Sequence, residues 1–193
     1  MWHETLGLPI AAACGWLASE AAVAWRTWRA RRDFTDATAR DGGSVWVVFA
    51  GTPVAGAVFF LLITQAIPWA TVGQGWQAVG LGLMLGGIFL RWAAVLTLGR
   101  HFSLVVATSP SQPLVTSGPY RVVRHPAYAA VLATSAGLGL ASGSWLGSAF
   151  LAGVAWALFS YRIRVEEAAL AAHFGPTYEA YRARTWRLIP WIF

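Results

Sequence analysis

The chain has 193 residues and a formal net charge of +6, and 57% of its residues are hydrophobic whereas 11% are charged. Because soluble domains carry about 25% charged residues, this composition excludes an ordinary soluble protein and predicts a single membrane domain, residues 1–193. The absence of lysine excludes a lysine Schiff base, and the single cysteine, Cys14, excludes an intrachain disulfide and a thiolate metal cluster, so no metal site is expected.

Five apolar runs predict five transmembrane helices, because a bilayer core about 30 Å thick requires about 20 apolar residues in helical conformation. The last two runs are short and are separated only by Ala141-Ser142-Gly143-Ser144, so they predict a tight helical hairpin. The fold class is therefore an all-α integral membrane protein, with three helices in residues 1–98. The five runs are Leu6–Trp25, Val45–Ile67, Gln77–Leu98, Tyr128–Leu140 and Trp145–Tyr161.

The arginines set the expected orientation. All but one of the 14 basic residues fall in the segments after the first, third and fifth runs, on one side of the membrane if the helices alternate. The positive-inside rule then places the N-terminus outside and the C-terminus in the cytoplasm of a multi-pass protein of the cell (inner) membrane. Because these arginines flank apolar spans, the lipid bilayer with its anionic headgroups, and not nucleic acid, is the expected partner.

Arg91 is the exception, because it lies inside the third run. An arginine at a helix centre costs about 2.5–3.5 kcal/mol on insertion scales. Arg91 is near the cytoplasmic end of its helix, so the preferred interpretation is a side chain that snorkels to the headgroups. The alternative is a guanidinium that faces inward, near the functional site.

The fifth helix is expected to continue beyond the membrane to about His173. Gly175-Pro176 then ends it, since glycine and proline commonly follow a helix C-terminus. On this extension Arg162 and Glu166 are spaced i, i+4 and share a face. They form either a surface ion pair worth at most about 1 kcal/mol or part of a site that faces the loop before the hairpin.

A C-terminal helical extension follows. Residues Thr177–Arg184 predict a short amphipathic helix, in which Tyr178 and Tyr181 are expected to be packing or interface residues. The last segment, Arg187–Phe193, is expected to lie at the membrane interface.

The connection from Leu98 to Pro126 is far longer than most loops, and such loops are usually functional. Its second part, Gln112–Tyr128, is polar and basic, and its three prolines prevent a helix from running through it. We therefore predict a cytosolic loop that carries the active site. The sequence holds no Walker motif and no glycine fingerprint, so a nucleotide-like cofactor would be held without a Rossmann fold.

Four sequence elements follow one another in this half of the chain. They are Leu114-Val115-Thr116-Ser117-Gly118-Pro119-Tyr120, Arg124-His125-Pro126-Ala127-Tyr128, Arg162-x-x-x-Glu166-Glu167 and Phe174-Gly175-x-x-Tyr178-x-x-Tyr181. Together they resemble the isoprenylcysteine carboxyl methyltransferase family, a branch of the wider membrane methyltransferases that include phospholipid N-methyltransferases. The resemblance covers about Gly99–Ile192, whereas residues 1–98 are similar only in being transmembrane.

The resemblance implies that residues 99–193 are a catalytic region that uses S-adenosyl-L-methionine and releases S-adenosyl-L-homocysteine. It implies carboxyl O-methylation of a lipophilic or lipidated, isoprenylcysteine-like acceptor, with Arg162 and Glu166 as catalytic residues and Arg162 facing the substrate. Gln112 stands where the family commonly has histidine. The implied cofactor contacts are Gln112, Pro113, Leu114, Val115, Tyr120, His125, Pro126, Ala127, Tyr128 and Glu166.

Elementary chemistry agrees with these roles. Methyl transfer from a sulfonium mainly requires positioning, and the rings of Tyr120 and Tyr128 can offer π faces to a cation. Glu166 suits the ammonium group of the cofactor, and Arg162 can hold a carboxylate through two hydrogen bonds. His125 either contacts the cofactor or only caps the helix that follows it.

Other functions stay open at this point. A lipophilic acceptor can enter between helices while the polar cofactor arrives from the cytoplasm, which suits N-methylation of a phospholipid or another lipid as well as carboxyl methylation. A membrane sterol-type reductase would bind a reduced nicotinamide instead. A small permease or assembly subunit would bind neither cofactor.

Overall fold

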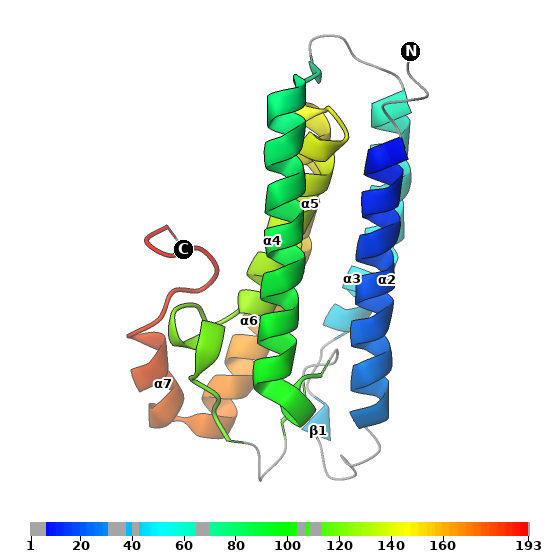
Figure 1. Ribbon diagram of the computed structural model, residues 1–193. Helices are drawn as coiled ribbons and strands as arrows, with labels where there is room; N and C mark the ends of the chain where they lie inside the picture. The colour runs from blue at the N-terminus through cyan, green and yellow to red at the C-terminus, as the bar shows by residue number, and fades with distance from the viewer. Residues whose placement is uncertain are drawn as a thin grey trace.

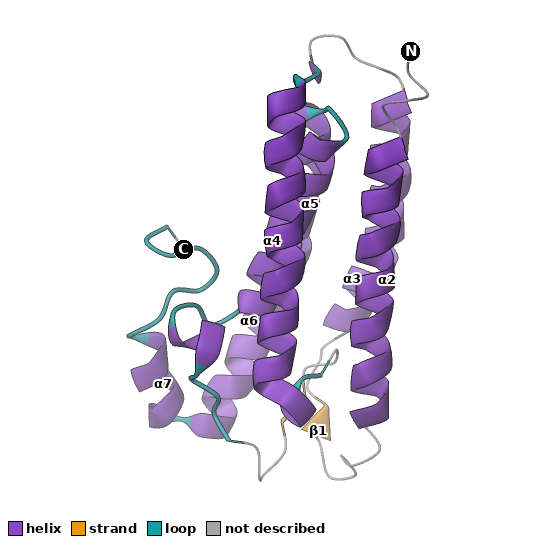
Figure 2. Cartoon of the chain, viewed as in Figure 1, coloured by secondary structure: helices purple, strands orange, loops and turns teal. Residues whose placement is uncertain are grey.

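The computed structural model describes residues 7–30, 38–39, 43–64, 70–103, 107–108 and 113–192. All of its long elements are helices (Figure 1, Figure 2). The α-helices are α2 (Gly7–Ala30), α3 (Ser44–Thr64), α4 (Gln74–Leu98), α5 (Pro126–Ala141), α6 (Trp145–Phe174) and α7 (Pro176–Arg182). The short elements are the 3-10 helices η3 (Gly99–His101) and η4 (Gly118–Arg121) and the antiparallel strands β1 (Thr38–Ala39) and β2 (Ala107–Thr108).

The five predicted apolar runs coincide with α2 to α6, so the described part of the chain is mostly helical, as expected. Two helical stretches, Gln74–His101 and Trp145–Phe174, are long and apolar enough to cross a membrane by length and composition. A crossing by all five helices stays a prediction. The predicted hairpin is present, because only Ser142–Ser144 separate α5 from α6, and the Ser144 hydroxyl caps α6 by accepting from the Gly147 N–H at 2.9 Å.

The contact between α4 and α5 depends on glycine. A Cβ atom added at Gly87 would lie 2.8 Å from the carbonyl oxygen of Ala130, and one added at Gly137 would lie 2.5 Å from the backbone nitrogen of Met84. Small residues allow helix backbones to approach this closely in membrane proteins. The two helices therefore form a closely packed pair, which α6 joins through the hairpin; α2 contacts α4 and α5, and α3 contacts α6.

The end of α6 follows the sequence prediction. The helix is 30 residues long and ends at Phe174, one residue beyond the predicted His173. Gly175 has a φ of 53°, which favours glycine, and its N–H donates to the Ala171 carbonyl. Pro176 begins α7, whose bounds differ by one or two residues from the predicted short helix, as helix ends commonly do.

The C-terminal segment is attached to the loop before α5 by backbone hydrogen bonds. Val123 and Trp186 form a parallel bridge, in which Trp186 N donates to the Val122 carbonyl at 3.0 Å and Arg124 N donates to the Trp186 carbonyl at 2.7 Å. The His125 N–H donates to the Arg187 carbonyl at 3.1 Å. We call residues 122–125 together with residues 186–187 the clasp. The sequence did not predict it, since it joins segments far apart in the chain.

Candidate functional site

The loop before α5 contributes to the site through η4, which contains Tyr120. Gly118 has a φ of 57°, a value that favours glycine, and Pro119 is in the first turn of the short helix. This turn buries the ring of Tyr120, which packs against Phe102 and Ala127. The hydroxyl of Tyr181 in α7 donates to the Tyr120 carbonyl at 2.7 Å, so the loop is held from both sides.

His125 begins α5 through its backbone. Its carbonyl accepts from the N–H groups of Tyr128 and Ala129, whereas its imidazole makes no capping hydrogen bond. The imidazole is buried and faces two carboxylates of α6: Nδ1 lies 3.9 Å from Glu166 Oε2 and Nε2 lies 3.4 Å from Glu167 Oε1. The interpretation of His125 as only a helix cap is therefore wrong for its side chain.

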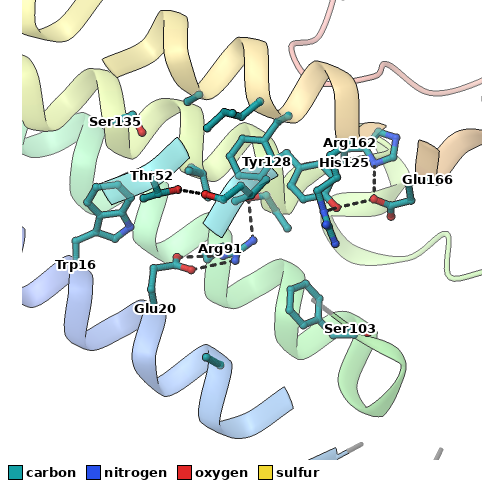
Figure 3. A pocket seen from close by; sticks show the side chains of 18 of the residues that line it. Trp16, Glu20, Thr52, Arg91, Ser103, His125, Tyr128, Ser135, Arg162 and Glu166 are labelled. Atoms are coloured by element: carbon teal, nitrogen blue, oxygen red, sulfur yellow. Dashed lines mark hydrogen bonds and ion pairs between the residues drawn. The ribbon is translucent and has the colours of Figure 1, made fainter. Parts of the chain in front are cut away.

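Tyr128 links the two residues that were predicted to be catalytic. Its hydroxyl donates to Glu166 Oε2 at 2.6 Å and accepts from Arg162 Nε at 2.8 Å (Figure 3). Its ring stacks on Phe159 with the ring centroids 4.8 Å apart. Arg162 is 4% exposed, and its Nη1 also donates to the Ser44 hydroxyl at 3.2 Å. The interpretation of Arg162 and Glu166 as a surface ion pair is wrong, because Arg162 is buried.

Glu167, the neighbour of Glu166, holds the clasp against α6. Arg124 Nε donates to its Oε1 at 3.1 Å, and Arg187 Nη2 donates to its Oε2 at 2.8 Å. Arg124 also donates to the carbonyls of Arg182 and Thr185. Sequence reasoning missed this role, although two adjacent glutamates in a chain with few acidic residues were a signal for it.

Arg91 faces inward. It is 7% exposed and forms an ion pair with Glu20 of α2, with Nη2 and Oε2 3.0 Å apart. The preferred interpretation, a side chain that snorkels to the headgroups, is therefore wrong. Glu20, which is 71 residues away in the sequence, compensates the charge of Arg91 inside the protein.

The tyrosines outside the predicted spans are neutral. Burial raises the pKa of Tyr120 far above its ordinary value, and the nearby Glu166 carboxylate raises it further. Burial also raises the pKa of Tyr178, and it raises the pKa of Tyr181 to about 12 although Arg124 opposes the shift. All three therefore keep their protons at neutral pH. Tyr178 and Tyr181 are buried, so of the two expected roles, packing and interface, the structure favours packing.

The site opens into a cavity of about 810 Å³. Its polar end is formed by the loop, the first turn of α5 and the middle of α6 (Figure 3), and its other end by apolar residues of α2, α3, α5 and α6 such as Trp16, Phe59, Leu138 and Leu151. Among the described residues, no group of three or more His, Cys, Asp or Glu could hold a metal ion.

Most of the predicted contacts come together at the polar end. Pro126 is buried without lining the cavity, and Gln112 lies outside the described residues. Glu20, Ser44 and Glu167 belong to the site or its support and were not predicted, because their roles depend on contacts between distant segments. The predicted residues that line the cavity are Pro113, Leu114, Val115, Tyr120, His125, Ala127, Tyr128, Arg162 and Glu166.

The chain is similar to a known family. A family model described as "Isoprenylcysteine carboxyl methyltransferase (ICMT) family" matches residues 79–172. A protein-S-isoprenylcysteine O-methyltransferase of Schizosaccharomyces pombe is 36% identical over 119 residues, which cover 61% of this chain and 50% of the relative. A probable protein-S-isoprenylcysteine O-methyltransferase of Oryza sativa subsp. indica is 32% identical over 134 residues, which cover 67% of this chain and 70% of the relative.

A solved structure is similar as well. It is described as the eukaryotic intramembrane Ras methyltransferase ICMT (isoprenylcysteine carboxyl methyltransferase), and it matches with a TM-score of 0.60 and 28% identity. The match covers 75% of this chain and 52% of that structure. This chain thus spans about half the length of the yeast relative and of the solved structure, and a larger share of the rice relative.

Proposed function

Because the chain belongs to the isoprenylcysteine carboxyl methyltransferase family, we propose that it transfers a methyl group from S-adenosylmethionine to the carboxylate of a lipophilic, isoprenylcysteine-like acceptor. The family assignment confirms the resemblance that the four sequence elements carried. The cofactor, the acceptor and the roles of individual residues are proposals. The observation that carries them is one cavity that joins a charged end to an apolar end.

The charged end suits the donor. Glu166 lines the cavity with a carboxylate that is 29% exposed, and Tyr120 and Tyr128 line it with aromatic rings. An anionic group beside aromatic rings is the environment that a sulfonium and an ammonium group require. We assign Glu166 to the ammonium group and the two rings to the adenine or the sulfonium. Bound there, S-adenosylmethionine supplies an electrophilic methyl group.

Arg162 suits the acceptor carboxylate. It lines the cavity beside Tyr128, and its guanidinium is 5.9 Å from the centre of the Tyr128 ring. A carboxylate that is already ionised attacks a methyl group without a general base, and the products are a methyl ester and a neutral thioether. The residues must therefore orient the carboxylate and exclude water, and positioning of this kind can contribute most of the rate.

Tyr128 lies between the residue that we assign to the donor and the residue that we assign to the acceptor. Its hydroxyl contacts both Arg162 and Glu166, so the residue assigned to the acceptor and the residue assigned to the donor share one hydrogen-bonding partner. The apolar end of the cavity, beside Phe59 and Leu138, suits a lipid tail. The proposed topology, with five spans and a cytoplasmic C-terminus, lets the acceptor enter from the bilayer and the donor from the cytoplasm.

The first test is donor binding. Calorimetry with S-adenosylhomocysteine should detect binding to the wild-type protein in detergent or nanodiscs, and Glu166→Gln should weaken it at least about tenfold, or by about 1.4 kcal/mol, because it removes the charge that faces the ammonium group of the ligand. Glu179→Gln is the matched control, since the Glu179 side chain is exposed on α7 and pairs with Arg182. Absence of binding by the wild type would refute the methyltransferase assignment.

The second test is the acceptor. The wild-type protein should form a base-labile methyl ester on a prenylated cysteine carboxylate and should not methylate the amide of the same compound. Transfer to phosphatidylethanolamine but not to the carboxylate would instead establish a lipid N-methyltransferase. A requirement for reduced nicotinamide would establish a reductase.

A further inference from the structure

Arg91 and Glu20 form a charged pair inside the cavity that the proposed mechanism does not use. Arg91 Nε donates to Glu20 Oε1 at 3.1 Å, and Nη2 donates to Glu20 Oε2 at 3.0 Å (Figure 3). Two parallel hydrogen bonds between a guanidinium and a carboxylate fix orientation as well as distance. Both residues line the cavity.

The third nitrogen of Arg91 contacts the hairpin of α5 and α6. Nη1 donates to the carbonyl oxygen of Ala127 at 3.3 Å. Ala127 lies in the first turn of α5, directly before Tyr128, whose hydroxyl joins Arg162 to Glu166. One guanidinium of α4 therefore connects α2 to the turn from which the central tyrosine projects.

The surroundings of the pair indicate a positioning role rather than a contribution to stability. A buried ion pair is a poor source of stability, since well-packed apolar residues of similar volume often serve as well or better. Trp16 and Ala24, one turn of α2 on either side of Glu20, also line the cavity. The helix α2 is thus one wall of the cavity. Glu20 attaches this wall, through Arg91, to the first turn of α5.

We propose that Glu20 and Arg91 are positioning residues through which α2 is fixed to the first turn of α5, so that the pair sets the width of the cavity on the acceptor side. The inference rests on the proposed function and deepens it, because it assigns control of acceptor fit to an N-terminal helix that lies outside the 79–172 match to the family model. Loss of the pair widens the cavity toward the acceptor and leaves the donor contacts of Tyr120 and Glu166 in place.

The first arm of the test measures the attachment of α2 directly and requires no methyl transfer. Cys14 of α2 is the only cysteine and is exposed, and Leu85 of α4 is 58% exposed. Spin labels at Cys14 and at Leu85→Cys give the distance between the two helices by pulsed electron spin resonance in nanodiscs. We expect a narrow distribution that broadens in Glu20→Gln.

The second arm measures kinetics. Glu20→Gln and Arg91→Lys should raise the KM for a prenylcysteine acceptor at least about tenfold, which corresponds to about 1.4 kcal/mol of lost contact with the acceptor, and should change the KM for the donor little. The double variant Glu20→Gln/Arg91→Gln removes both charges, so it avoids an uncompensated buried arginine if a single variant does not fold. It should show the same shift in acceptor KM.

Ser19→Ala is the matched control. Ser19 accepts a hydrogen bond from Trp92 Nε1 at 2.8 Å, so it also joins α2 to α4, but neither residue lines the cavity. An unchanged distance distribution in Glu20→Gln, an equal effect of Ser19→Ala, or a donor KM that changes as much as the acceptor KM would each overturn the inference. If the wild type transfers no methyl group, the proposed function fails, and the spin-label arm alone decides on the pair.

Discussion

Two regions of the molecule are held together in different ways. In α4, α5 and α6, glycines such as Gly87 and Gly137 bring backbones into contact, and Glu167 with the clasp fixes the loop before α5. The helix α2, by contrast, is joined to α4 by side-chain contacts, which are both polar, such as Glu20 with Arg91, and apolar, through the buried Val23. The residues that we assign to the donor lie in the first region, whereas α2 and α3 supply much of the apolar cavity wall.

This division matches the demands of the proposed reaction. The donor must be held in one geometry, which backbone-to-backbone packing and buried hydrogen bonds provide. The lipid tail of an acceptor makes only apolar contacts, which are not directional and remain favourable when a helix shifts slightly. The region matched by the family model, residues 79–172, contains α5 and most of α4 and α6, and it stops short of α7 and the clasp residues 186–187.

The largest effect is expected where the two regions meet, at Arg162. Arg162→Ala should lower kcat/KM for a carboxylate acceptor at least about a hundredfold, which corresponds to about 2.7 kcal/mol, because it removes a buried charged contact. Arg162→Lys should recover little of this loss, since lysine lacks the planar fork. Methyl-ester formation measures both variants.

The control for Arg162 is Arg164, which lies in the same helix and is exposed. Arg164→Ala should retain the kcat/KM of the wild type. Equal losses in the two variants would mean that net charge on α6, and not a carboxylate contact, governs the activity.

The second-largest effect tests the close packing of α4 against α5 at Gly87. Gly87→Ala should lower the free energy of unfolding by about 1–3 kcal/mol, because the added methyl group overlaps the Ala130 carbonyl of α5 and forces the helices apart. Gly86→Ala is the control, since a Cβ atom there meets nothing within 4 Å and alanine is the better helix former. Unfolding in mixed detergent measures both; a stable Gly87→Ala protein would contradict the packing argument.

Local signals account for what the sequence predicted correctly. Apolar runs located α2 to α6, because the hydrophobicity of consecutive residues determines where such helices form. Gly175-Pro176 located the end of α6, because glycine adopts the backbone conformation needed there and proline does not continue a helix. The motifs on the loop and on α6 located most of the polar end of the cavity. Tyr128 and Glu166 were expected to belong to one site, and a hydrogen bond of 2.6 Å joins them.

Features that depend on distant partners were not predicted. The sequence places Arg91 near a membrane surface, but the choice between lipid and Glu20 depends on how α2 packs against α4, which no local pattern encodes. The same holds for the bridge between Val123 and Trp186, and for Glu167, whose two arginines lie 43 and 20 residues away. Buried polar groups must find partners, yet the sequence alone does not say which.

A moderate effect is expected from loosening the clasp. Glu167→Gln keeps the side-chain volume but removes the charge that holds Arg124 and Arg187, so we expect S-adenosylhomocysteine to bind about tenfold more weakly, or by about 1.4 kcal/mol. Calorimetry measures the affinity. The kcat at saturating donor should change less than the affinity, because Glu167 does not line the cavity. A loss confined to kcat would contradict this assignment.

The smallest effect is expected at Tyr181, whose hydroxyl donates to the Tyr120 carbonyl at 2.7 Å. Tyr181→Phe should lower the free energy of unfolding by about 1 kcal/mol at neutral pH, because it leaves a carbonyl of the loop without this donor. Thermal unfolding with and without S-adenosylhomocysteine measures the loss. The ring stays in place, so the acceptor KM should be retained.

The pH dependence of the stability of Tyr181→Phe tests whether burial keeps the Tyr181 phenol protonated. Burial raises the pKa of Tyr181 to about 12 in the folded protein, against about 10 for an exposed tyrosine. The unfolded chain therefore releases this proton first, so the contribution of Tyr181 to stability is complete below pH about 10 and is lost as the pH rises through about 12. Tyr181→Phe has no such proton, so the gap in stability between wild type and variant should narrow in this range. A gap that stays constant as the pH rises would mean that the phenol is not held protonated by burial.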